Sequence, residues 1–173
     1  MDLPAKFAFE DAVNLSSIVD IVPGFKGDVS QFRTSLDLSR DVDRLHKHPF
    51  IQIWYVRGGS YRHCFAGTDF ILGKGALMIV PPYYPHYLDT RGDSELVRCE
   101  FSQDFIADLP PSEIRDSLFN LVYLEPVLVN TNQIEPYHYF TGDAAQELET
   151  IFEELRHEYE KHDAFSSMFV RAN

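Results

Sequence analysis

The chain has 173 residues, and its 45% hydrophobic content is sufficient for one packed domain. Its 27 acidic residues outnumber its 15 basic ones, and the formal charge of −12 opposes binding of most of its surface to DNA phosphates. Two cysteines, Cys64 and Cys99, are too few for a disulfide framework, so we expect buried thiols. Because neither a secretory signal nor an apolar run of about 20 residues is visible, we expect a cytoplasmic protein without membrane contact.

After an amino-terminal arm, assigned to residues 1–30, short apolar runs alternate with Gly, Pro, Asp and Asn. This spacing is typical of antiparallel strands that close into a sandwich or barrel, assigned to residues 31–140. We expect strands at residues 31–38, 50–56, 60–65, 68–72, 76–80, 84–89 and 96–101. Because Gly58-Gly59 lies between apolar and aromatic runs, we also expect a tight hairpin at residues 56–61.

The pattern of apolar residues changes from Pro110 onward, and a short helix is expected near residues 112–121. Residues 122–140 give no firm assignment. A second helix is expected at residues 143–161, because apolar residues recur there at intervals of three and four. This stripe comprises Leu148, Ile151, Phe152, Leu155 and Tyr159. A further stripe begins near residue 165 and is cut off at the end, so residues 141–173 are expected to form a helical pair in a protein that continues.

Polar side chains gather on one face of the strand expected at residues 50–56 and of the residues just before it. In an extended chain His46, His48, Gln52 and Trp54 point to one side, because side chains alternate between the two faces. His86 follows the strand that ends at residue 80. Polar groups on a face that aliphatic residues would otherwise fill indicate a site inside the sheet.

The residues around this face resemble the first sequence motif of the cupin family. That motif is His-x-His, a Glu four residues later and a Gly seven residues after the Glu. His46, His48 and Gly59 match it. Gln52 stands in place of the Glu, and Arg40 in place of an introductory Gly.

The second cupin motif is matched by Gly75, Pro81 and His86, whereas Tyr83 replaces its second Gly and Thr90 its closing Asn. The order of parts from about residue 45 to the terminal helices is similar to the amino-terminal domain of AraC-family transcription regulators. The resemblance implies a mainly β fold, a cupin-type double-stranded β-helix or jelly-roll barrel, followed by a C-terminal helical pair. It also implies two helix-turn-helix units after residue 173.

Two kinds of site remain open for the histidine cluster. His46, His48 and His86 could hold Zn²⁺, Ni²⁺ or Fe²⁺, although an amide at position 52 is a much poorer ligand than a carboxylate. Alternatively, aromatic and polar groups line a pocket for a small effector such as a sugar, without any required cofactor. The expected effector-binding residues are His46, His48, Gln52, Trp54, Tyr61, His63 and His86.

We therefore expect an effector-sensing, non-enzymatic domain of an AraC-type bacterial regulator. The apolar stripe of residues 148–159 is expected to form a homodimer contact. DNA would be bound only through a C-terminal domain that these 173 residues lack. The alternatives are a metal-dependent cupin oxygenase or isomerase and a stand-alone small-molecule-binding cupin.

Overall fold

The computed structural model describes residues 13–14, 27–33, 45–65, 67–89, 93–104, 112–124 and 135–161. The strands are β1 (Val13–Asn14), β2 (Gly27–Arg33), β3 (His46–Lys47), β4 (Ile51–Phe65), β5 (Thr68–Gly73), β6 (Ala76–Val80), β7 (His86–Asp89), β8 (Ser94–Phe101) and β9 (Tyr137–Tyr139). The helices are α2 (Glu113–Phe119), the π-helical turn η2 (Asn120–Leu124) and α4 (Gly142–Lys161). The expected mainly β fold with two helical regions is confirmed, while a helix after residue 161 lies outside the described residues.

The hairpin expected at residues 56–61 is wrong, because β4 runs without reversal through 15 residues. Its register against β8 shifts between Val56 and Gly58, and Gly59 has a φ of 68°. A Cβ at Gly59 would lie 2.1 Å from the carbonyl oxygen of Asp93. The glycines therefore permit a bulge and a close strand approach, and these bend the strand instead of turning it.

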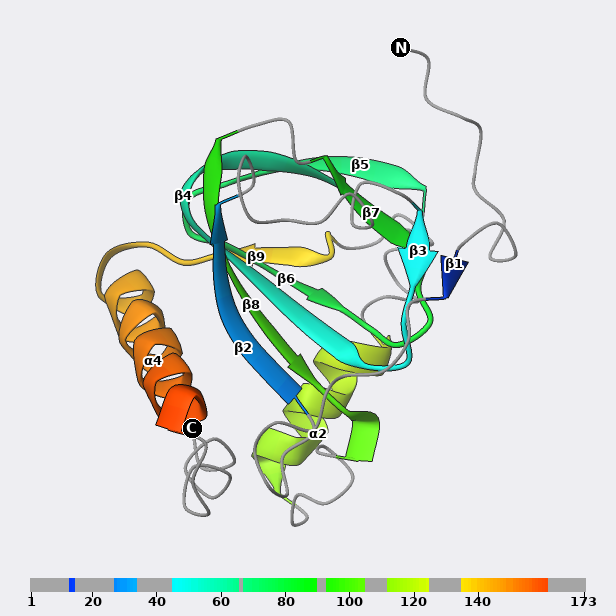
Figure 1. Ribbon diagram of the computed structural model, residues 1–173. Helices are drawn as coiled ribbons and strands as arrows, with labels where there is room; N and C mark the ends of the chain where they lie inside the picture. Colours follow the sequence, from blue (N-terminus) through cyan, green and yellow to red (C-terminus); the bar gives the residue numbers. More distant parts are fainter. Residues whose placement is uncertain are drawn as a thin grey trace.

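The bent strand β4 pairs with two different groups of strands, one along its first half and one along its second half (Figure 1). Its first half pairs with β6 and β8, which in turn pair with β9 and β2. Its second half pairs with β5 and β7, and β7 pairs with β3. All these pairings are antiparallel, whereas β1 and β3 run parallel. Strand β4 thus joins the group of β2, β6, β8 and β9 to the group of β3, β5 and β7.

Two groups of buried residues lie on opposite faces of β4. Trp54 and Val56 belong to an interior cluster with strands β5 to β8, whereas Ile51 and Tyr55 pack toward α4. On that outer side the rings of Tyr55 and Phe152 stack with centroids 5.4 Å apart. Alternation along the strand therefore separates the interior site from the surface that holds the helix.

The helix expected at residues 143–161 is confirmed as α4. Of its stripe, Phe152 and Leu155 are buried against the sheet of the same chain, and Leu148 and Ile151 are half-buried beside them. The side chain of Tyr159 lies outside the described part of the structure. The core of one chain thus accounts for part of the stripe, and its role in a dimer stays a prediction.

The helix expected near residues 112–121 is also present, as α2. Ser112 caps it by accepting a hydrogen bond from the Arg115 backbone N–H, at 3.2 Å. The chain then tightens into η2 before the described segment ends at Leu124. Both cysteines are free and buried, as expected.

Candidate functional site

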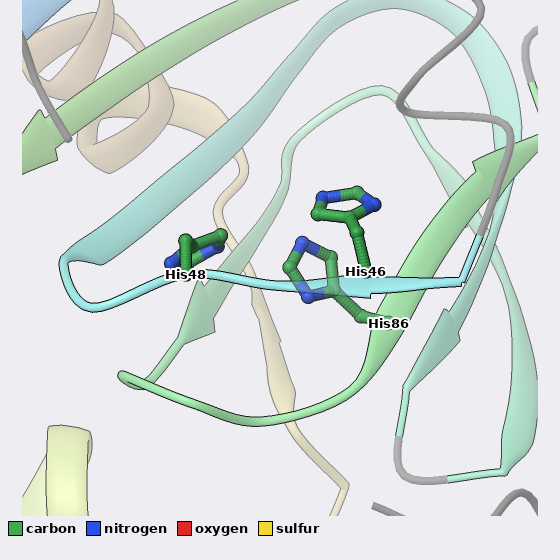
Figure 2. Close-up of side chains that lie close together, drawn as sticks. All are labelled: His46, His48 and His86. Atoms are coloured by element: carbon green, nitrogen blue, oxygen red, sulfur yellow. The ribbon is translucent and has the colours of Figure 1, made fainter. Parts of the chain in front are cut away.

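Three imidazole rings from two strands converge in the interior (Figure 2). His46 and His48 come from β3 and the residue after it, and His86 begins β7. Ring centroids lie 4.2 Å apart for His46 and His86, and 4.9 Å apart for His48 and His86. All three side chains are at most 1% exposed. The His-x-His spacing therefore places both rings on the side of the strand that faces His86.

Local pairing fixes this convergence. His46 lies directly opposite His86 in the β3–β7 ladder. The turn before β7 is tied to the same segment, because the Tyr83 backbone N–H donates to the His48 carbonyl oxygen at 2.7 Å. Tyr83 adopts a φ of 64°, a conformation that glycine accepts without strain. The turn thus keeps the backbone shape of the expected motif, although the residue is tyrosine.

Backbone carbonyl groups orient two of the rings. The Nδ1 atom of His48 lies 2.7 Å from the carbonyl oxygen of Phe50, and the Nδ1 atom of His86 lies 3.0 Å from that of Tyr84. A carbonyl oxygen only accepts, so the proton of neutral His48 resides on Nδ1. Its Nε2 atom then carries a lone pair, and no described group forms a hydrogen bond with it. Such outer hydrogen bonds are typical of imidazoles that present a lone pair to a ligand.

A second polar network adjoins the rings. The Gln52 amide donates to the Glu100 carboxylate at 2.6 Å, and its oxygen accepts from the Trp54 indole N–H at 3.1 Å. This amide orientation is fixed by a pure acceptor on one side and a pure donor on the other. The amide oxygen also lies 3.2 Å from the Nε2 atom of His86. Arg98 forms an ion pair with Glu100 at 3.1 Å.

The second half of β4 adds another pair of interacting polar side chains. The Tyr61 hydroxyl lies 3.0 Å from the Nδ1 atom of His63, and the His63 ring is 5.4 Å from that of His86. His63 is fully buried, and its Nε2 atom has no hydrogen-bond partner among the described residues. The bend in β4 therefore brings a fourth imidazole to the cluster.

Burial sets the protonation of these rings. Removal from water, together with the positive charge that neighbouring imidazoles would carry, lowers the pKa of His48 to about 4 and that of His63 to about 3. The pKa of His86 also lies well below its usual value for the same reasons. His48, His63 and His86 are accordingly neutral near pH 7 and can offer lone pairs.

The donor set fits a divalent metal. The ligand atoms of His46, His48 and His86 lie within 4.8 Å of one another. An atom at the centre of a triangle of that size lies about 2.8 Å from each corner, a hydrogen-bond length. Metal–imidazole bonds of about 2.0–2.1 Å would require the rings to close in by less than about 1 Å. The bare Nε2 atom of His48 supports this fit, since a buried lone pair without a partner is costly.

The structure brings the seven expected effector-binding residues to one buried region. Each is at most 3% exposed, including Trp54, Tyr61 and Gln52. Tyr83, by contrast, is 52% exposed. Sequence reasoning did not select Glu100, which contacts Gln52 across the β4–β8 ladder. A signal was present, because Arg98 and Glu100 are two residues apart and so lie on one face of β8, between apolar residues.

No helix in the described part of the chain is long and apolar enough to cross a membrane. No curated protein sequence matches the chain.

Solved structures with related strands share little sequence with it. A cupin protein from Bacteroides fragilis is 11% identical, with 54% of this chain and 75% of that chain covered and a TM-score of 0.38. A protein from Neisseria meningitidis is 20% identical over 46% and 75% of the two chains, with a TM-score of 0.34. A Cupin 2 conserved barrel domain protein from Salinispora arenicola is 14% identical over 44% and 77%, with a TM-score of 0.30. Scores of this size carry no functional conclusion.

The match to a sequence family is far more extensive. Residues 29–172 match the AraC-like ligand binding domain, which spans every strand from β3 to β9 and the whole of α4. The histidine cluster, the polar network of Gln52 and the helix packed on β4 all lie inside the matched range. The chain therefore belongs to the AraC-like ligand-binding domain family.

Proposed function

We propose that the chain is the effector-sensing and dimerisation domain of an AraC-type bacterial transcription regulator, and that it is not an enzyme. The observation that carries this proposal is the buried cluster of imidazoles with two nitrogen atoms, His48 Nε2 and His63 Nε2, that lack hydrogen-bond partners among the described residues. Buried polar atoms almost always form a hydrogen bond, so these two nitrogen atoms indicate a bound ligand. The two parts of the sheet would close around it as a cupin-type jelly roll.

The course of β4 supports a path from the site to the protein surface. Gln52 and Trp54 lie in the polar network, whereas Tyr55 and Arg57 of the same strand contact α4. Arg57 forms an ion pair with Glu149 at 2.7 Å and another with Glu153. A ligand that moves the first set of side chains would also move the second, since they share one backbone segment.

The amino-terminal arm offers a second path. Strand β1 pairs in parallel with β3, and Val13 lies opposite His46 in this register. A ligand that holds His46 in place would favour this pairing. Control would then be a shift between populations with the arm attached and released, driven by the difference in ligand affinity between them.

We assign the dimer contact to α4. Leu148 and Ile151 are only half-buried by their own chain, so they retain apolar surface for a second copy. Ile151→Lys should shift the chain toward monomer in sedimentation, and Gln146→Lys, which adds the same charge at an exposed position of α4, is the matched charge control. An unchanged mass for Ile151→Lys would show that α4 serves only the fold. DNA binding would belong to a domain outside this sequence.

The sensor proposal is tested by screening a small-molecule library for compounds that raise the melting temperature of the chain. A ligand that binds only the native state raises the melting temperature with the logarithm of its excess over Kd. Compounds that stabilise the chain should lose most of this effect in His48→Gln. If no compound stabilises the chain, or the same compounds stabilise both proteins equally, the sensor proposal fails.

A divalent metal at the three histidines is a second candidate occupant, favoured by the 4.8 Å span of their ligand atoms. His46, His48 and His86 would hold it, with Gln52 as an additional neutral oxygen ligand. Such a metal would supply a Lewis acid that polarises an oxygen of the bound effector. Elemental analysis of chain purified without a polyhistidine tag tests this. One equivalent of metal that is lost in His48→Gln supports it, and metal-free, fully folded protein contradicts it.

A further inference from the structure

The bulge in β4 inserts one residue into the pairing with β8. Val56 lies opposite Leu96 of β8, and Gly58 lies opposite Glu95, the residue that precedes Leu96. Arg57 is therefore the extra residue of the bulge. Because side chains alternate along a strand, an extra residue reverses which positions point to each face.

This reversal brings both halves of β4 to the histidine cluster. Before the bulge, the even-numbered residues Gln52 and Trp54 lie in the polar network. After the bulge, the odd-numbered residues Tyr61 and His63 face the interior, and the His63 ring lies 5.4 Å from that of His86. Side chains of the site therefore come from both sides of the bulge, and a change in the bend would alter their separation.

The side chain of the bulge residue reaches α4. Arg57 is 13% exposed and forms ion pairs with Glu149, at 2.7 Å, and with Glu153. These two carboxylates are four residues apart, so they lie on one face of the helix in successive turns. One guanidinium thus holds two turns of α4 against the strand.

The backbone beside the bulge holds the entry to the same helix. The Gly75 N–H donates to the Val56 carbonyl oxygen at 2.8 Å, and the Gly75 carbonyl accepts from the Phe140 N–H at 2.9 Å. Phe140 precedes the first residue of α4 by two positions. Gly75 has a φ of 87°, and a Cβ there would lie 2.4 Å from the Phe140 carbonyl oxygen, so this close approach requires glycine. The bulge is therefore attached to α4 at two places.

We propose that the bulge at Arg57 is a hinge that transmits occupancy of the interior site to α4, with Arg57 as the positioning residue of the helix. This inference rests on the proposed sensing function and names the element that regulates its output. A ligand that contacts both halves of β4 favours one bend of the strand, and the two attachments carry α4 with the bulge. The half-buried Leu148 and Ile151 are then presented differently to a second copy.

Hydrogen exchange in α4 tests the hinge without any ligand. Trp54→Phe and His63→Gln each alter the interior on one side of the bulge, and exchange in α2 reports general loss of stability. Each variant should speed exchange in α4, relative to α2, by about tenfold, the change expected when one buried hydrogen bond is lost. Two variants on opposite sides of the bulge keep the test valid if one of them does not fold.

The same two substitutions are then made in a chain that carries Arg57→Gln. Their effect on α4 should fall to less than about threefold, because only the Gly75 attachment remains, and such non-additivity measures the coupling. Arg57→Lys keeps one positive charge and should restore part of the response. Arg156→Gln is the matched control, because this arginine pairs with Glu153 and Glu160 within α4, and the full response should persist there.

The outcomes separate this hinge from the proposed sensing function. Equal responses in the Arg57→Gln and Arg156→Gln chains, or equal acceleration of exchange in α2 and α4, would overturn the hinge. Either result would leave a stabilising ligand from the library screen unaffected. A coupled α4 in a chain that no compound stabilises would instead support the hinge and contradict the sensing function.

Discussion

The side chains of Gln52 and Glu100 face each other across two central strands, and the amide donates to the carboxylate at 2.6 Å. Gln52 is 3% exposed and Glu100 is 6% exposed. The sequence position expected to carry a carboxylate therefore carries an amide, and the carboxylate comes from the neighbouring strand. This exchange leaves a neutral oxygen beside His86 and places the negative charge next to Arg98.

Removal of the Glu100 carboxylate should disturb the whole polar network. Glu100→Ala leaves the Gln52 amide without its buried acceptor, and we expect the free energy of unfolding to fall by about 2–3 kcal/mol in urea denaturation. Glu100→Gln keeps an oxygen acceptor and should lose less. Glu154→Gln, an exposed carboxylate on α4, should change stability by less than about 0.5 kcal/mol. Equal stability of Glu100→Ala and the unaltered chain would show that the network is not coupled to folding.

Stability should fall as the pH drops from 6.5 to 5. The pKa values of buried His48 and His63 are lowered to about 4 and about 3, whereas the unfolded chain binds protons near pH 6.5. In this window the unfolded state holds more protons, so stability is full above pH 6.5 and declines below it. Each such histidine contributes a slope of up to about 1.4 kcal/mol per pH unit.

The variant His63→Gln isolates one contribution to this slope. Its free energy of unfolding should depend less steeply on pH between 6.5 and 5 than that of the unaltered chain. His157→Gln, which replaces an exposed histidine on α4, is the control for loss of a histidine outside the cluster. Identical slopes for the unaltered chain and His63→Gln would mean that His63 is protonated in the folded state.

The ion pairs of Arg57 should hold α4 against the sheet. Arg57 is 13% exposed and binds both Glu149 and Glu153, so Arg57→Gln should lower the free energy of unfolding by about 1 kcal/mol. Hydrogen exchange in α4 should rise in the same variant. Arg115→Gln removes a pair with the 71% exposed Asp116 and should have little effect. If exchange in α4 stays the same, apolar packing such as the Tyr55–Phe152 stack holds the helix without the ion pairs.

The left-handed conformation of Tyr83 predicts an unusual order of substitutions. Tyr83→Gly should be close to neutral, because relief of strain offsets the larger entropy of glycine in the unfolded chain. Tyr83→Val should destabilise the chain by at least about 1 kcal/mol, since a β-branched residue resists positive φ. Thermal unfolding of both variants checks this order, and a valine variant as stable as the glycine variant would contradict it.

Much of the fold and the site followed from strand alternation. Because side chains alternate, His46 could be placed beside His48, and Gln52 beside Trp54, before any tertiary contact was known. The two pairs come from separate strands, since β3 ends at Lys47 and β4 begins at Ile51. The hairpin at Gly58-Gly59 was wrong because glycine permits both a reversal and a bulge. Only the pairing of β4 with β8 distinguishes the two, and that pairing joins residues distant in sequence.

Two other features depend on long-range packing. The Gln52–Glu100 contact spans 48 residues and requires the register of two strands, which local patterns do not contain. The apolar stripe of α4 was visible, but its period alone does not say whether it packs on the same chain or on a second copy. Phe152 and Leu155 are buried within the chain, and only tertiary packing distinguishes them from half-buried Ile151.

The central claim is that the effector binds at the imidazole cluster, and calorimetric titration of a library ligand into three proteins tests it most directly. The unaltered chain and the control His157→Gln should bind with equal affinity. His48→Gln should bind at least about tenfold more weakly, since it loses one buried hydrogen bond to the ligand. Equal affinity in all three proteins would place the ligand elsewhere and contradict the account.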